Sequence, residues 1–145
     1  MKKVFLSALI ITIVHPLLGQ EKTAFFTGEW VTEPSLSGWV FSIKLNMDGT
    51  GIIGSGKYVD KKLQLFDNMK EDLENWYIKN DTLTLRAKPV IPGYTSEPRN
   101  TIYRYLIIEK KKGQFSAYHF PPVWNEKNLK NSKASTVKVV LKKLE

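Results

Sequence analysis

Residues 38–58 carry the pattern that most constrains the fold, because hydrophobic and polar side chains alternate along them. A period of two places one set of side chains on a single face, which is typical of a β-strand with one buried face. The hydrophobic members of the set are Trp39, Phe41, Ile43 and Leu45. Asp48-Gly49 follows and predicts a type I′ hairpin turn, in which both central residues have positive φ.

Short strand-forming segments, separated by residues that favour turns, occur along the whole chain after the first 22 residues. They are expected at residues 23–32, 39–46, 51–58, 63–66, 76–79, 82–86, 101–109, 114–120 and 137–144. Residues 68–75 are polar and acidic, and they fit a short helix or an extended loop equally well. This spacing predicts an all-β fold. Connections of hairpin length favour an antiparallel up-and-down β-barrel of about eight strands, which removes both sheet edges by closing on itself.

The first nineteen residues have the layout of a secretory signal peptide. Lys2 and Lys3 precede an apolar run over residues 4–14, and small or breaking residues follow up to Gly19. We expect cleavage after Gly19, which leaves residues 20–145 as one secreted or periplasmic domain. The alternative is an uncleaved anchor, but the apolar run is shorter than the roughly 20 residues of a spanning helix. No integral membrane span is therefore expected after cleavage.

The amino-acid composition excludes several kinds of catalytic and metal-binding site. The chain has no cysteine, which excludes disulfides, thiolate metal sites and a cysteine nucleophile. His119 is the only histidine after the signal segment, so a histidine metal cluster is excluded as well. The net charge of +8 would suit an anionic partner. Export argues against nucleic acid as that partner, and the lysines lie mainly in predicted turns and in the last strand.

The sequence contains few residues in patterns that are typical of an enzyme active site. His119 lies between Tyr118 and Phe120 in a predicted strand, where a structural, hydrogen-bonded histidine is the simpler interpretation. No nucleophile-elbow motif supports a Ser-His-Asp triad. Glu71, Asp72 and Glu74 lie in the most polar segment, which favours solvated carboxylates over a catalytic pair. We therefore expect no enzyme, no catalytic residue, no metal site and no cofactor.

A ligand site is expected instead among aromatic and polar side chains of the predicted strands, since small-molecule sites are largely apolar with a few placed polar groups. The candidates are Trp39, Phe41, Tyr103, Arg104, Tyr105, Tyr118 and His119. Tyr103 and Tyr105 share one face of their strand and Arg104 lies on the other. The sequence leaves open which face lines the barrel. A buried Arg104 would need an anionic partner or ligand, and the aromatic residues could also simply fill the barrel.

Several short motifs add a resemblance. They are Gly28-x-Trp30, Asp48-Gly49-Thr50-Gly51, Trp76-x-Ile78 and Asn80-Asp81-x-Leu83-x-Leu85. In this order they resemble the lipocalin-like small β-barrels of secreted bacterial proteins, within the calycin-type group. The resemblance implies that Trp30 plugs one end of the barrel and that the other end opens to a ligand cavity. The group's arginine that packs on this tryptophan from the last strand has no clear match here, and Lys142 or Lys143 could replace it.

These observations predict an exported, non-enzymatic barrel that binds a small hydrophobic or amphipathic ligand. The alternative is an envelope protein-interaction or inhibitor module whose barrel is completely filled by its own side chains. A hydrolase that uses His119 is a third and weaker hypothesis. A cavity of several hundred Å³ would favour ligand binding, whereas a filled interior beside an exposed apolar patch would favour the interaction module.

Overall fold

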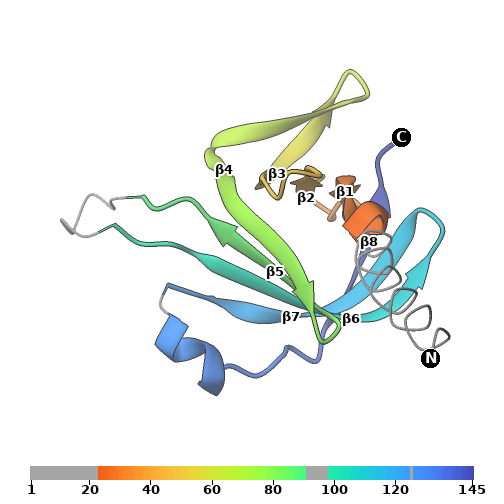
Figure 1. The fold of residues 1–145 in the computed structure, drawn as a ribbon. Helices are drawn as coiled ribbons and strands as arrows, with labels where there is room; N and C mark the ends of the chain where they lie inside the picture. The colour runs from red at the N-terminus through yellow and green to blue at the C-terminus, as the bar shows by residue number, and fades with distance from the viewer. Residues whose placement is uncertain (1–22, 91–97, 125) are drawn as a thin grey trace, which may run out of the picture.

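The predicted all-β fold is confirmed by a computed structural model, which describes residues 23–90, 98–124 and 126–145. The signal segment and its expected cleavage site lie outside the described residues. Figure 1 shows the strands of one strongly curved sheet, and the buried hydrophobic side chains form one core cluster. The elements are β1 (Gly28–Val31), β2 (Val40–Leu45), β3 (Gly51–Val59), β4 (Lys62–Lys79), β5 (Thr82–Ala87), β6 (Ile102–Lys111), β7 (Gln114–Val123), a 3-10 helix η1 (Glu126–Asn131) and β8 (Lys138–Lys143).

Each strand pairs antiparallel with the next, and β8 returns to pair with β1, so the sheet closes into a barrel. This is the up-and-down arrangement that the hairpin-length connections predicted. The closing contact is short: only Trp30 with Lys143 and Val31 with Lys142 are ladder partners between β1 and β8. β1 ends at Val31, so residues 138–141 of β8 have no ladder partner on this side among the described residues, which leaves a seam in the barrel wall between the end of β1 and the start of β8.

The two ends of the barrel differ because the connections differ in length. The β2–β3, β4–β5 and β6–β7 connections are tight and lie at one end, which we call the closed end. The β1–β2, β5–β6 and β7–β8 connections are longer and lie at the opposite, open end, together with the β3–β4 hairpin. Figure 1 shows this hairpin projecting beyond the barrel.

The predicted type I′ turn at Asp48-Gly49 is wrong, because only Gly49 of the pair has positive φ, at 88°. The Gly49 amide instead donates to the carbonyl of Asn46 at 3.1 Å, and the Asp48 carboxylate accepts from the Thr50 amide at 2.9 Å. A side-chain acceptor beside a left-handed glycine favours this longer loop. The strands expected at 76–79 and 82–86 leave Asn80 and Asp81 as a two-residue turn, and this turn is confirmed by their φ of 49° and 56°.

The polar residues 68–75 form neither a helix nor a loop, since they belong to the continuous strand β4. The separate strands expected at 63–66 and 76–79 are its two ends. β4 holds together through backbone pairing with β3, for example Ile52 with Asp72, which does not depend on hydrophobic side chains. Irregularities between Gly54 and Gly56 and between Leu73 and Asn75 bend the ladder. At the N-terminal side, residues 23–26 form a helical turn where a strand was expected.

An aromatic cluster fills the closed end. Trp30 is 1% exposed, and its indole Nε1 donates to the carbonyl of Phe26 at 2.7 Å, so the helical turn caps this end. The rings of Trp30 and Phe115 meet edge to face with centroids 4.9 Å apart. Of the two lysines that could pack on Trp30, it is Lys143 that does so, because its Nζ lies 5.4 Å from the Trp30 ring centroid. The Nζ of Lys142 instead donates a hydrogen bond to Glu33 Oε1 at 2.6 Å.

Candidate functional site

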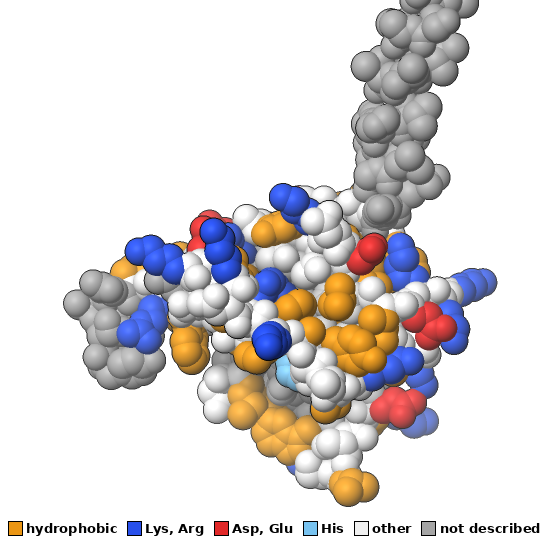
Figure 2. Space-filling view, turned by 90° about the horizontal axis from the view of Figure 1, so that it is seen from below, with side chains coloured by type: hydrophobic (Ala, Val, Ile, Leu, Met, Phe, Trp, Pro, Cys, Tyr) orange, Lys and Arg blue, Asp and Glu red, His pale blue; other side chains and the backbone are white. Residues whose placement is uncertain are grey.

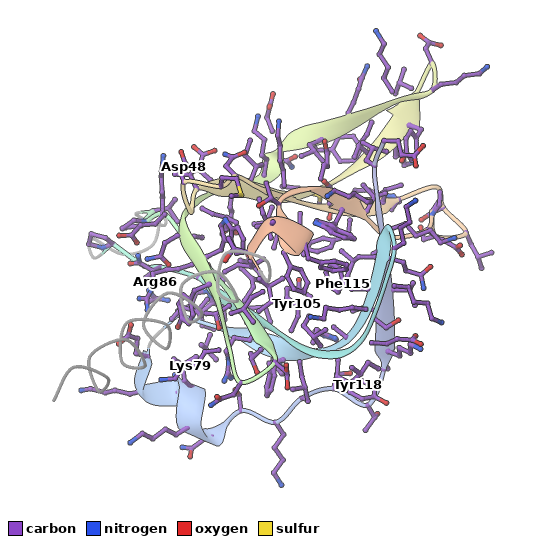
Figure 3. The ribbon with its side chains drawn as sticks, turned by 45° about the vertical axis from the view of Figure 1, so that its right-hand side comes forward. Asp48, Lys79, Arg86, Tyr105, Phe115 and Tyr118 are labelled. Carbon is purple, nitrogen blue, oxygen red and sulfur yellow. The ribbon has the colours of Figure 1, made fainter. Side chains whose placement is uncertain are left out.

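Strand pairing decides which face of β6 lines the barrel. Tyr105 is the ladder partner of Leu83, and Tyr103 is the partner of Leu85. Both leucines are fully buried in the core cluster, so the two tyrosines share the inner face with them. Tyr105 is only 7% exposed, and Figure 3 shows it inside the barrel together with Phe115. Arg104 therefore lies on the outer face.

A pocket of about 210 Å³ lies at the seam between β1 and β8, toward the open end. It is lined by Thr32, Phe41, Tyr105, His119, Val139 and Leu141. We call it the mouth pocket. Its walls are mainly apolar, and no acidic side chain is among the lining residues. In Figure 2 a small area of histidine surface is visible next to hydrophobic side chains. The structure thus brings together three of the predicted site residues, Phe41, Tyr105 and His119.

The polar groups of the mouth pocket come from adjacent strands. His119 is the ladder partner of Tyr105, and its backbone carbonyl accepts from the Ser135 amide at 2.7 Å. Its side-chain Nδ1 is buried and has no hydrogen-bond partner within the described part of the chain. Burial raises the pKa of Tyr105, so this hydroxyl stays protonated in the pocket wall. A buried polar atom without a partner is costly, and a ligand could supply the missing hydrogen bond.

Tyr103 lies on the same inner face, but it has a partner of its own. Its hydroxyl donates to Glu71 Oε1 at 2.9 Å. Burial raises the pKa of Tyr103, and the Glu71 carboxylate raises it further. Glu71 reaches the interior because it pairs with Ile53, whose side chain is in the core. This pair is a satisfied polar contact beside the core, and neither residue lines the mouth pocket.

Trp39 lies at the rim of the open end. It is 37% exposed, and its ring centroid is 5.0 Å from that of Phe66 in the projecting part of β4. Lys57 Nζ lies 5.6 Å from the Trp39 ring centroid. The β1–β2 loop and the β3–β4 hairpin are held together by these contacts, which makes Trp39 a residue of the rim and not of the pocket lining.

Arg104 and Tyr118 lie outside the barrel. The Arg104 guanidinium lies 4.3 Å from the Phe120 ring centroid and donates to the Ser132 hydroxyl. Burial lowers its pKa, and its Nε has no partner among the described residues. Tyr118 pairs with Lys138 in the ladder, and Figure 3 shows it on the outer side. The seven predicted site residues therefore divide between the interior, the rim and the outer wall.

Sequence reasoning missed half of the mouth pocket. The sequence pattern places Thr32 in the first strand and Val139 and Leu141 in the last strand, but it indicates no role in a site for any of them. The alternation of Val139 and Leu141 in the last strand was a usable signal, because it places both on one face. Glu71 was missed because its neighbours are polar, which hid the strand period.

No group of three or more metal-ligating side chains occurs in the ranges that the structure describes. No helix among those residues is long and apolar enough to cross a membrane. Searches against protein-family models, curated proteins and solved structures found no match to this chain.

Proposed function

We propose that the protein is an exported, non-enzymatic barrel that binds a small amphipathic molecule in the mouth pocket. The observation that carries the proposal is the buried, unpartnered Nδ1 of His119 in a pocket with mainly apolar walls. Such a pocket suits a ligand with a hydrophobic body and one polar group, because the polar group can bond the imidazole while the body contacts Phe41 and Val139.

The size of the pocket limits the ligand. Its volume of about 210 Å³ exceeds the roughly 150 Å³ of an engineered apolar cavity that binds benzene. It falls short of the roughly 300 to 1,000 Å³ of pockets for drug-sized molecules. The expected ligand is therefore the size of a substituted benzene ring or a short acyl chain. Longer ligands would extend through the seam into solvent.

The first test is native mass spectrometry of the protein purified from its source, which should detect a retained small molecule. The second test adds benzyl alcohol or hexanoate as probes and follows the NMR signals of the His119 ring. Both probes combine a small apolar body with one polar group. The absence of a retained mass, together with an unchanged His119 signal for both probes, would refute the proposal.

Two neighbouring valines of β8 provide a matched pair of variants. Val139 lies on the inner face of β8, so Val139→Phe fills the mouth pocket. Val140 lies on the outer face of the same strand, so Val140→Phe adds the same volume outside the pocket. Binding of either probe should be lost in Val139→Phe and retained in Val140→Phe. Loss of binding in both variants would indicate a general effect on folding, and circular dichroism of each variant separates this outcome.

A second candidate function, the protein-interaction module, is favoured by exposed hydrophobic side chains around the open end. Leu36 in the β1–β2 loop is fully exposed, and Tyr58, Val59 and Met69 in the β3–β4 hairpin are each at least 40% exposed. Scattered apolar side chains are common on surfaces, but a group around one rim can mark an interface. Leu36→Ser combined with Val59→Ser should abolish capture of an envelope protein if this function is correct, and leave probe binding unchanged.

Export is part of the proposal. Intact mass and N-terminal sequencing of the protein isolated from the periplasm or medium should show Gln20 as the first residue. A chain that retains residues 1–19 would argue for an anchored form.

A further inference from the structure

We infer that a second site, an open groove on the outer wall of the barrel, binds a neutral oligosaccharide. The groove has a volume of about 660 Å³ and is formed by residues of β4, β5 and β6 together with Asn100, Trp124 and the start of η1. Its lining includes Glu74, Asn75, Arg86, Asn100, Ile102 and Trp124. None of these residues lines the mouth pocket, so the inference is independent of the proposed function.

Two irregularities in the sheet shape this groove. On β4 the ladder shifts between Leu73 and Asn75, so Glu74 and Asn75 are both exposed although they are neighbours in a strand. On β7 the ladder shifts between the partners of Ile102 and Arg104. Beyond this shift Val123 is buried and Trp124 is exposed. Bulges re-aim side chains and are common beside binding sites, and here both are next to the same groove.

The aromatic wall is Trp124, which is 62% exposed. An exposed indole offers a large, rigid apolar face at little conformational cost. Ile102, which is 2% exposed, supplies an apolar floor. Pyranose rings have one face made mainly of C–H groups, and this face stacks on an indole while the hydroxyls at the ring edge remain free to form hydrogen bonds.

The polar rim is arranged in pairs of donors and acceptors. Arg86 donates to the Glu126 carboxylate, and Asn100 Nδ2 donates to Glu74 Oε2 at 3.2 Å. Figure 3 shows Arg86 on the side of the barrel away from Phe115. A hydroxyl both donates and accepts, so it can add a hydrogen bond to either pair, whereas an apolar ligand would exclude water from these groups and offer no hydrogen bond in return.

The charges in the groove favour a neutral ligand over a phosphate. The lining holds two carboxylates, Glu74 and Glu126, and two cations, Arg86 and Lys127, so its formal charge is zero. The Arg86 guanidinium already pairs with Glu126. A phosphate group placed there would meet no net positive charge, because the two carboxylates oppose its attraction to the two cations. A neutral sugar carries no such penalty. The groove is also open to solvent, so we expect weak binding, with a Kd on the order of 1 mM.

The test titrates the purified protein with cellotriose, maltotriose and tri-N-acetylchitotriose and follows the indole N–H signal of Trp124 by NMR. At least one trisaccharide should shift this signal. Trp124→Ala should weaken binding about tenfold or more, as measured on the signals of Asn75 and Asn100. Trp39→Ala is the matched control, since it removes another exposed tryptophan outside the groove, and it should leave binding unchanged.

A second variant separates the ligand classes without touching the core. Glu74→Gln removes a charge but keeps an oxygen acceptor, so binding of a neutral sugar should persist in it. If AMP shifts the Trp124 signal more strongly than all three trisaccharides, the groove is an anion site and the inference is wrong. It is also wrong if none of the three sugars moves the signal, or if sugar binding survives in Trp124→Ala.

Discussion

At the scale of single residues, the two tyrosines of the inner face make the stability of the folded protein depend on pH under alkaline conditions. Burial raises the pKa of Tyr103 and of Tyr105, and Glu71 contributes at Tyr103. In the unfolded chain both hydroxyls titrate near the ordinary value of about 10. The folded state therefore binds more protons than the unfolded state above this pH. Their contribution to stability is complete below about pH 10 and is lost as the pH rises toward the folded pKa values.

We predict that these two tyrosines remain protonated at the ordinary tyrosine pKa of about 10. Tyrosinate absorbance should rise in two phases, with the second phase coinciding with alkaline unfolding measured by circular dichroism. In Tyr103→Phe the amplitude of the second phase should fall, because one of the two tyrosines with a raised pKa among the described residues is gone. A single phase that is complete before unfolding would contradict the burial of both hydroxyls.

Trp30 and Trp39 provide a second prediction at this scale. Trp30→Phe removes the hydrogen bond to the Phe26 carbonyl and part of a fully buried side chain. It should lower the free energy of unfolding by about 2–4 kcal/mol. Trp39→Phe makes the same chemical change at the partly exposed rim and should cost less than about 1 kcal/mol. Urea denaturation measures both, and equal losses would contradict the assignment of Trp30 to the closed end.

At the scale of elements, β3 depends on its glycines because neighbouring strands approach it closely. A Cβ at Gly56 would lie 2.0 Å from the Gln64 carbonyl oxygen and 2.9 Å from the Leu65 Cα. Both are backbone atoms of β4, so the strand itself would have to move. The ladder between β3 and β4 shifts between Gly54 and Gly56, so this close approach lies at the irregularity in the sheet.

Gly56→Ala should therefore destabilise the protein by about 1–3 kcal/mol, in the range of overpacking changes. The matched control is Ser55→Ala in the same strand, which removes a hydroxyl and adds no new atom. Thermal unfolding of both variants gives the comparison. If Gly56→Ala is as stable as Ser55→Ala, the close approach of β4 is not present in solution.

The middle of β4 is a strand that local side-chain periodicity does not predict. The sequence predicts strands at its two ends, residues 63–66 and 76–79, but does not distinguish a helix from a loop for residues 68–75. Their polar side chains carry no period of two that periodicity could detect. They are strand because β3 supplies partners for their backbone groups, which is information that lies elsewhere in the chain.

At the scale of the whole molecule, barrel closure depends on the short contact between β1 and β8. Val31 and Lys142 are ladder partners there. Partners in an antiparallel ladder have Cα atoms roughly 4.5–5.5 Å apart, which suits a disulfide. The natural chain has no cysteine that could interfere.

We predict that Val31→Cys combined with Lys142→Cys forms a disulfide on air oxidation. The crosslink should raise the free energy of unfolding by about 2–4 kcal/mol, because it closes a long loop. The same variant under reducing conditions is the control. Absence of the crosslink by mass spectrometry would contradict closure between β1 and β8. If ligands enter at the seam, oxidation should also slow the exchange of benzyl alcohol at the mouth pocket.

The sequence by itself determined the fold class, the number of strands to within one, most turns and the aromatic candidates. These depend on local side-chain alternation and on turn chemistry, which neighbouring residues set among themselves. Only the tertiary structure decided that Tyr103 and Tyr105 face inward and that Arg104 faces outward. It also decided that Lys143, and not Lys142, packs on Trp30. The pairing of β1 with β8 over two residue pairs is likewise a tertiary feature. These features depend on pairing between distant segments. Alternation shows that a strand has two faces, but only its neighbours determine which face is buried.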